Sequence, residues 1–237
     1  MMGPLRSWAA RAVETLDDPR ADASVVVASL RDIARINRIF GGARAAARRV
    51  DEFLGATPPG TTLTLLDVGT GSGDIPRAVA RRAARRGIRL RLLGLERHPA
   101  AAREAARSGD LAAILADGAQ LPLRARAVDL VLCSKVLHHA PGEAGARLIA
   151  ELDRVARLGV VVADIRRSAL AAAGIWLAGH ALRFHPVTRR DSVISVFRGF
   201  TPGELRLACA AGGVRAVVRS HPAWCLTAAW RPAPAHP

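Results

Sequence analysis

Short runs of apolar residues recur along the middle of the chain and alternate with segments whose apolar residues are spaced as on one face of a helix. The runs are nearly free of charge, as is typical of strands buried on both faces of a parallel sheet. Helical spacing follows Asp74, Pro99 and Pro141. We therefore predict an α/β fold, a mostly parallel sheet with helices on both faces. The five runs cover residues 62–68, 90–95, 111–116, 128–133 and 158–165.

The N-terminal fifth of the chain shows helical spacing only. One helix is expected from a capping box formed by Ser29 and Asp32, and another over residues 43–54. The sequence Thr57-Pro58-Pro59-Gly60 reads as a linker. We predict two regions in a single functional unit: an N-terminal helical cap or substrate lid over 1–56, and the main domain over 57–237.

The C-terminal end departs from the alternation in another way. After a helix with a capping box at Thr201 and Glu204, two apolar runs, 214–220 and 224–230, follow with no helix between them. Consecutive strands joined by a short turn pair antiparallel. The sequence predicts a C-terminal antiparallel hairpin at the edge of the sheet.

A glycine-rich loop follows the first apolar run. Gly69, Gly71 and Gly73 let the backbone turn sharply and approach a ligand, and the next helix begins with free N–H groups. The spacing GxGxG differs from the GxGxxG of dinucleotide-binding loops, and Asp67 and Asp74 flank it. Two carboxylates repel a diphosphate and attract a cation. A nicotinamide-dependent dehydrogenase is therefore the least favoured of the functions considered.

Two more carboxylates end the next two strands. Glu96 is placed to accept hydrogen bonds from both hydroxyl groups of a ribose, and Asp117, before Gly118 and Ala119, from an adenine amino group. Ligands of parallel sheets bind at the carboxyl ends of the strands, where these residues fall. The alternative is that the acidic residues only cap helices and form turns.

Four motifs in this region resemble successive motifs of the class I S-adenosylmethionine-dependent methyltransferases of the small-molecule type. The resemblance covers residues 65–165 and implies a Rossmann-like sheet of seven strands, with the hairpin as the last two. It also implies that the protein is an enzyme that uses S-adenosylmethionine and releases S-adenosylhomocysteine. The motifs are LLDVGTGSGDIP, LLGLERHP, ADGAQLPL and VDLVLCSKVLHH.

The resemblance assigns roles to single residues. Asp67 and the loop glycines would hold the methionine end of the cofactor, Glu96 the ribose, and Asp117 with Gly118 the adenine. Arg97 would cover an adenine face. The complete predicted cofactor set is Asp67, Gly69, Thr70, Gly71, Gly73, Asp74, Glu96, Arg97, Asp117, Gly118, Ala119 and Ser134.

In this family the segment after the fourth strand faces the methyl donor, and here it contains His138 and His139. Histidine titrates near neutral pH, so either imidazole is a candidate base for a phenol or hydroxyl proton. The alternative is that one of the two points into the core or caps the next helix. No metal site is predicted, because Cys133, Cys209 and Cys225 lack metal-ligand spacing.

Acceptor pockets in this family use the N-terminal helices and the segment after the fifth strand. Apolar side chains with a few Arg and His in these regions suit a small aromatic or lipophilic acceptor, as in polyketide or quinone-type secondary metabolism. Oxygen is favoured over carbon as the methylated atom. The alternative is that the apolar residues only pack on the sheet. The predicted acceptor-binding residues are Asn37, Phe40, Arg166, Trp176, His185 and Arg189.

Two alternatives to a small-molecule methyltransferase stay open. The chain has 35 Lys and Arg against 20 Asp and Glu, a formal net charge of +15, which keeps an RNA or protein methyltransferase open. The other alternative is a non-catalytic, cofactor-binding partner subunit, because the sequence does not single out one catalytic residue. DNA is not expected as a substrate, because Ser134-Lys135-Val136 stands where the family's amino-methylating enzymes carry Asn/Asp-Pro-Pro-aromatic.

Neither a signal peptide nor a membrane span is predicted. The first 16 residues lack the apolar core of a signal peptide, and the longest uncharged apolar run, 168–182, is shorter than the roughly 20 residues that span a bilayer. We expect a cytoplasmic protein that acts on a small-molecule acceptor. Whether it forms a homodimer is left open.

Overall fold

The computed structural model describes residues 3–233 and contains one seven-stranded sheet with the order β3-β2-β1-β4-β5-β7-β6. The first five strands are parallel, and β7 and β6 pair antiparallel at one edge. The predicted α/β fold with its C-terminal hairpin is therefore confirmed. The strands are β1 (Thr62–Val68), β2 (Arg89–Glu96), β3 (Leu111–Leu115), β4 (Val128–Ser134), β5 (Ala156–Ile165), β6 (Val217–His221) and β7 (Cys225–Trp230).

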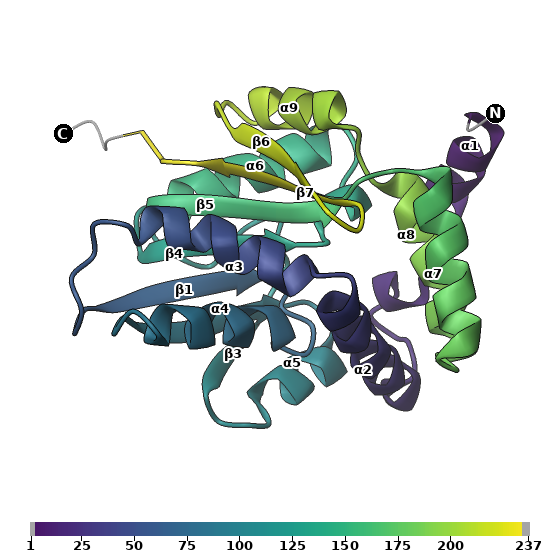
Figure 1. Ribbon diagram of the computed structural model, residues 1–237, viewed down its shortest axis with the longest axis horizontal. Coiled ribbons are helices and arrows are strands. Elements are labelled where there is room, and N and C mark those ends of the chain that lie inside the picture. Colours follow the sequence, from purple (N-terminus) through teal and green to yellow (C-terminus); the bar gives the residue numbers. More distant parts are fainter. Residues whose placement is uncertain (1–2, 234–237) are drawn as a thin grey trace.

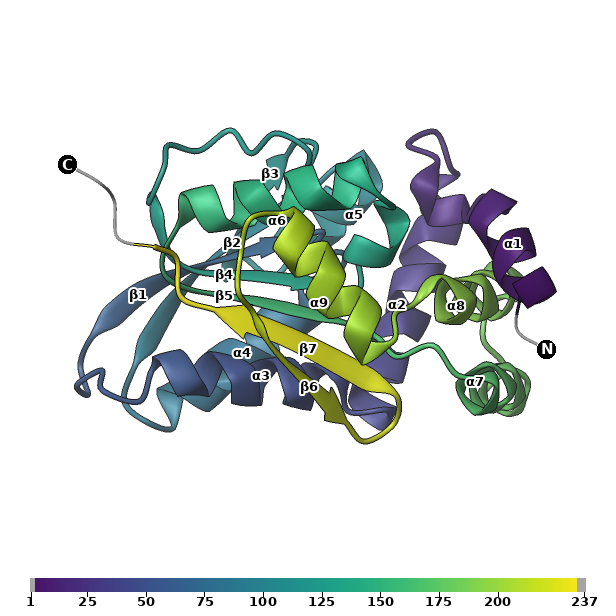
Figure 2. The ribbon, with the colours of Figure 1, turned by 90° about the horizontal axis from the view of Figure 1, so that it is seen from above.

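Helices cover both faces of the sheet, as Figure 2 shows (Figure 1 labels the elements). One apolar core lies between the sheet and α3, α4 and α5, and a second lies between the sheet and α6 and α9. Burial on both faces explains why the central strands are runs of Val and Leu. These helices are α3 (Gly42–Phe53), α4 (Asp74–Ala84), α5 (Pro99–Ala106), α6 (Glu143–Val155) and α9 (Pro202–Ala211).

A further group of helices lies beyond the carboxyl ends of the parallel strands, on the right in Figure 1. A separate apolar cluster joins them, with Ile36, Ile175 and Phe197 among its buried members. This group places a second wall opposite the ends of the strands. It comprises α1 (Gly3–Arg11), α2 (Ala23–Ile39), α7 (Ala169–Ala181) and α8 (Pro186–Arg198), with the short 3₁₀ helix η1 (Thr15–Asp17) beside them.

Two predicted helix starts are wrong. α2 begins at Ala23, six residues before the expected capping box, because the Asp22 side chain accepts hydrogen bonds from the N–H groups of Ser24 and Val25. Ser29 and Asp32 are buried inside this helix. α6 begins at Glu143 rather than Pro141, which lies in the loop after the short helix η2 (Leu137–His139).

The N-terminal segment does not form one layer of its own. α3 packs against α4 and β5, whereas α1 packs against α8 and α2 against α5 and α8. Within residues 3–233, no helix is both long enough and apolar enough to cross a membrane.

The contact between α3 and β5 leaves no room for a side chain at Gly159. A Cβ atom there would lie 2.4 Å from Cδ1 of the Phe53 ring. Gly159→Ala is expected to lower the free energy of unfolding by about 1–3 kcal/mol through overpacking, measured by urea denaturation. Gly55→Ala is the matched control, since the nearest atom to its Cβ would be 3.6 Å away. Equal stability of the two variants would mean that Phe53 moves aside without cost.

Candidate functional site

A cavity of about 460 Å³ lies at the carboxyl ends of β1, β2, β4 and β5, between the sheet and the helices α2, α7 and α8. Every predicted cofactor residue except Gly73 lines it. Gly73 instead precedes the first residue of α4, with φ +75°. The residues brought together are Asp67, Gly69, Thr70, Gly71, Asp74, Glu96, Arg97, Asp117, Gly118, Ala119 and Ser134.

The glycine loop packs closely against the segment after β4. Gly69 has φ +71°, and a Cβ atom there would lie 2.2 Å from Cγ2 of Val136. Glycine is therefore required at this position both by backbone conformation and by space. Gly69 itself lines the cavity, so main-chain atoms of the loop face the cavity at this point.

Asp67 and Thr70 contribute polar atoms that the protein leaves unused. Within residues 3–233, Asp67 Oδ1 and Thr70 Oγ1 are buried and have no hydrogen-bond partner. Burial, together with the nearby carboxylates of Asp74 and Glu96, raises the pKa of Asp67 to about 8. A buried polar atom without a partner is costly, so this end of the cavity suits a ligand with hydrogen-bond donors or positive charge.

Glu96 is fixed by backbone groups. Its Oε2 accepts a hydrogen bond from the Gly71 N–H at 3.0 Å, and its Oε1 accepts from the N–H groups of Arg97 and His98 at 2.9 and 3.1 Å. Asp117 Oδ1 accepts from the Ala119 N–H at 2.8 Å. Both carboxylates therefore keep a set position at the rim of the cavity and retain free lone pairs.

The short helix η1 holds the Arg97 side chain in place. Its Nη2 donates to the carbonyl oxygen of Asp17 and to Asp17 Oδ1, both at 2.9 Å. The guanidinium lines the cavity from this position. The N-terminal segment and the second strand thus meet at one wall of the site.

His138 is buried and forms a pair with a carboxylate that ends β5. Its Nδ1 lies 2.7 Å from Asp164 Oδ1, and its backbone N–H donates to Asp164 Oδ2 at 3.2 Å. Burial alone would raise the pKa of Asp164, but the His138 imidazole and hydrogen bonds from the Ile165 backbone outweigh it and lower the pKa. An ionised Asp164 accepts the Nδ1 hydrogen, which leaves His138 Nε2 with its lone pair and no partner among residues 3–233.

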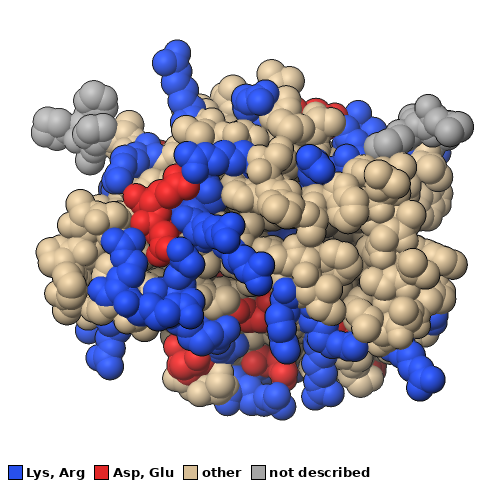
Figure 3. Space-filling model, viewed as in Figure 1, with Lys and Arg blue, Asp and Glu red and all other residues tan. Residues whose placement is uncertain are grey.

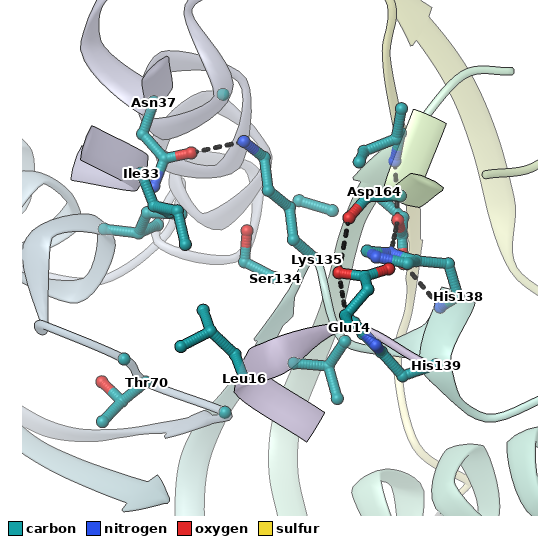
Figure 4. Close-up of a pocket in the computed structure, with 18 of the residues that line it drawn as sticks. Glu14, Leu16, Ile33, Asn37, Thr70, Ser134, Lys135, His138, His139 and Asp164 are labelled. Atoms are coloured by element: carbon teal, nitrogen blue, oxygen red, sulfur yellow. Dashed lines mark hydrogen bonds and ion pairs between the residues drawn. The ribbon is translucent and has the colours of Figure 1, made fainter. Parts of the chain in front are cut away.

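His139 belongs to a network of charged groups beside this pair (Figure 4). Its ring centroid lies 4.1 Å from that of His138, and its Nδ1 lies 3.0 Å from Asp17 Oδ1. Glu14 completes the network: its Oε2 is 4.0 Å from His139 Nε2, and its Oε1 is 3.2 Å from Arg198 Nη1. Burial raises the pKa of Glu14, although the neighbouring His139 and Arg198 oppose this.

Glu14, His138 and His139 each offer an atom within 4.8 Å of the others, a group that could hold a metal ion. Glu14 is already bound by other protein groups, since it accepts a hydrogen bond from Ser195 Oγ at 2.8 Å in addition to the Arg198 contact. The protein therefore satisfies this carboxylate by itself. His138 Nε2 is the atom of the three that is left without a protein partner.

The predicted acceptor residues divide into two groups. Asn37 and Phe40 line the cavity, whereas Arg166, Trp176, His185 and Arg189 do not. Trp176 is 53% exposed because Ala171, Ala172 and Ile175 form the buried face of α7, and the next residue turns outward by about 100°. His185 caps α8, accepting from the Val187 N–H.

Other residues of the same helices face the cavity instead. α2 and α7 contribute apolar side chains here, and α8 contributes hydroxyl groups, one carboxylate and one apolar side chain. They are Leu30, Ile33, Ile36, Ala171, Ile175, Thr188, Asp191, Ser192, Ser195 and Val196. The wall opposite the cofactor-side residues is therefore mainly apolar, with a polar strip along α8.

The sequence interpretation missed Asp164, Glu14 and Asp17. A signal existed for Asp164, because it is the single charged residue near the end of an otherwise apolar strand, as Asp67 and Glu96 are on theirs. No comparable pattern marks Glu14 or Asp17. These lie in an irregular segment that reaches the site only through tertiary packing.

The buried Asp67 carboxyl makes stability depend on pH. Its pKa is 3.8 in the unfolded reference and about 8 in the folded protein, so the native state binds this proton more tightly and loses stability as pH rises from about 4 to about 8. Asp67→Asn is expected to gain thermal stability relative to the unmodified protein over that range. Circular dichroism melting at pH 4, 6 and 8 measures it, with the exposed Glu143→Gln as control. A difference that does not grow with pH would contradict the assignment.

Comparison with known proteins gives one family match. Residues 66–163 match the family model described as a methyltransferase domain. No curated protein matches the chain. The matched segment contains the glycine loop, the carboxyl ends of β2, β3 and β4, and His138.

Several solved structures have a similar fold. A SAM-dependent methyltransferase from Aquifex aeolicus gives a TM-score of 0.61 at 15% identity, over 90% of this chain and 99% of that one. Magnesium protoporphyrin IX methyltransferase from Synechocystis, solved with bound SAH, gives 0.51 at 18%, over 81% and 84%. Human N-acetylserotonin methyltransferase, in complex with SAM, gives 0.55 at 14%, over 84% and 54%. At these identities the similarity concerns the fold.

Proposed function

We propose that the chain, whose residues 66–163 match a methyltransferase-domain model, is a class I S-adenosylmethionine-dependent methyltransferase. Its proposed reaction is methylation of an oxygen atom of a small aromatic or lipophilic acceptor, with carbon as the second choice. S-Adenosylmethionine supplies a methyl group on a cationic sulfur and leaves as S-adenosylhomocysteine. The observation that carries the proposal is that one cavity contains the acidic strand ends, the His138–Asp164 pair and the apolar face of α2. Polyketides and quinone precursors are acceptors of this chemistry.

The cofactor would bind along the strand ends. The unpartnered oxygens of Asp67 and Thr70 and the exposed main chain of the glycine loop fit the methionine end, with its cationic sulfur and ammonium group. Glu96, fixed by three N–H groups, fits the ribose hydroxyls, and Asp117 fits the adenine amino group. We also assign cofactor binding to the other predicted cofactor residues that line the cavity.

The acceptor would bind between the strand ends and the helical wall. Ile33, Ile36, Phe40 and Ile175 offer apolar surface there, and residues 1–56 would act in part as a lid through α2. Arg97 is the only arginine among residues 3–233 that lines the cavity. A polyanionic acceptor would require more positive charge at this position.

The arginine-rich surface lies elsewhere. Figure 3 shows many of these side chains gathered over α3 and α4, and several form ion pairs with Asp51 and Glu52. These carboxylates neutralise part of the positive charge. This surface therefore gives less support to an RNA or protein acceptor than the apolar cavity gives to a small one.

His138 would act as the base for an acceptor hydroxyl group. Its Nδ1–H bond to Asp164 fixes the ring and its tautomer, so Nε2 can take the proton while the oxygen forms its bond to the methyl carbon. Asp164 then stabilises the imidazolium that results. His139, held by Asp17, supports the ring by stacking and is the second candidate base.

Glu96→Ala is expected to abolish measurable binding of S-adenosylhomocysteine, because it removes both the proposed ribose acceptor and the anchor of the Gly71 N–H. Isothermal titration calorimetry measures the affinity. Glu143→Ala, at a side chain that is 93% exposed, should bind as the unmodified protein does. Unchanged binding by Glu96→Ala would remove the proposed cofactor assignment.

The acceptor can be identified by incubating cell extracts with the protein and S-adenosylmethionine that carries a deuterated methyl group, followed by mass spectrometry. Labelled products that carry the methyl group on a phenol or hydroxyl oxygen are expected. Label found only in RNA or protein would refute the proposed acceptor class.

With that acceptor, His138→Asn is expected to lower kcat by about 100-fold while S-adenosylhomocysteine binding is unchanged, since a positioned base contributes about 10²–10⁴-fold. Asp164→Asn should lower kcat as well, because it removes the charge that orients the imidazole. His180→Asn, on the outer part of α7, is the matched control. A kcat for His138→Asn equal to that of the control would exclude His138 as the base.

A further inference from the structure

Lys135 is the only lysine in the chain and lines the cavity directly after β4. Its φ is +57°, and its N–H donates to the carbonyl oxygen of Ala163 at 2.7 Å, so the neighbouring strand β5 holds this turn in place. The side chain points toward α2 (Figure 4). There Lys135 Nζ donates to Asn37 Oδ1 at 2.6 Å.

Asn37 connects this amine to a carboxylate on the glycine loop. Its Nδ2 donates to Asp74 Oδ2 at 2.9 Å, while its Oδ1 accepts from Lys135. The amide fixes Lys135 Nζ inside the cavity and separates the ammonium from the Asp74 carboxylate. Lys135 therefore has a fixed position without a direct ion pair.

The ammonium group has unused hydrogen-bonding capacity. It carries three N–H donors, of which the interactions among residues 3–233 use one, and no carboxylate of those residues lies within 4.0 Å of it. A charge in a desolvated position is costly unless it is paired. Burial accordingly lowers the pKa of Lys135, and the more distant Asp74 and Asp164 only partly oppose it.

The proposed cofactor would add a second positive charge to the same cavity. A cationic sulfur and an ammonium repel each other in a medium of low dielectric constant unless an anion lies near both. A bound ligand that brings an anionic oxygen to Lys135 would remove this repulsion and fill the free donors. Two ligands can supply this anionic oxygen. The cofactor would supply it through its methionine carboxylate, and the acceptor through a carboxylate or phenolate.

We propose that Lys135 is an anion subsite of this cavity, where its ammonium group, positioned by Asn37, binds an anionic oxygen of the cofactor or of the acceptor. The proposal rests on the proposed function, because both ligands come from it. An ammonium group is a compact point charge, which suits one oxygen atom rather than a planar bidentate group. The subsite therefore selects for a charged oxygen at this end of the cavity.

The first experiment compares two ligands that differ in the methionine end. S-Adenosylhomocysteine carries the carboxylate, and 5′-methylthioadenosine lacks it. Lys135→Met is expected to weaken S-adenosylhomocysteine at least 10-fold in calorimetry and to leave 5′-methylthioadenosine unchanged, which assigns the subsite to the cofactor. Arg124→Met removes one charge from an exposed position outside the cavity and is the control.

The second experiment tests the acceptor as the source. Benzoate and its neutral counterpart benzamide are titrated into protein saturated with S-adenosylhomocysteine. If the acceptor supplies the anion, the unmodified protein binds benzoate more tightly than benzamide, and Lys135→Met abolishes that preference. The proposal is overturned if Lys135→Met changes the binding of neither ligand pair. It is also overturned if Lys135→Met loses equal affinity for S-adenosylhomocysteine and 5′-methylthioadenosine, because an equal loss indicates damaged structure.

A spectroscopic measurement distinguishes anion binding by Lys135 from a purely structural role of this residue. Biosynthetic incorporation of lysine labelled with ¹³C at Cε labels Lys135 alone, since the chain has no other lysine. S-Adenosylhomocysteine or benzoate should shift the Lys135 signal and raise its titration midpoint, and the neutral counterpart should not. If the unmodified protein binds neither adenosine ligand, the proposed function fails. The benzoate and benzamide titration, repeated on the ligand-free protein, then still decides the role of Lys135.

Discussion

The parallel pairing of β1, β2, β4 and β5 determines where the chemistry of this protein lies. Because these strands run in one direction, their last residues meet at one edge, although they are far apart in the sequence. Asp67, Glu96, Lys135 and Asp164 all follow from this constraint, each at or just after the end of a strand. A shift of one strand by one residue would turn its terminal side chain to the opposite face of the sheet.

This arrangement is electrostatically unfavourable in the free protein. Asp67, Asp74 and Glu96 bring three carboxyl groups to one loop, and burial already opposes the ionisation of Asp67. Burial of the two apolar layers on the sheet stabilises the fold and offsets the repulsion between these carboxyl groups. A cationic ligand would relieve the repulsion, so the same groups that destabilise the free fold favour the bound state.

The predictable part of the molecule is the part governed by local pattern. Continuous apolar runs identified the strands, and the glycines with their flanking carboxylates located the loop, because period and turn chemistry are properties of adjacent residues. The sequence predicts the wrong start for α2, because Ser29 and Asp32 have the spacing of a capping box but are buried inside the helix. The sequence also does not predict which face of α7 is buried, because the helix is apolar all round and nothing marks Ile175 as buried and Trp176 as exposed.

Tertiary packing explains the remaining discrepancies, and α2 is the clearest case. Through Asn37 it contacts the lysine after β4 and the glycine loop, and through Asp32 it accepts the His185 N–H at the start of α8. One helix thus contacts both the residues at the strand ends and the start of α8. Hydrogen bonds between residues about 40 to 150 positions apart therefore fix α2 against the rest of the site, and such contacts leave no pattern among adjacent residues of the sequence.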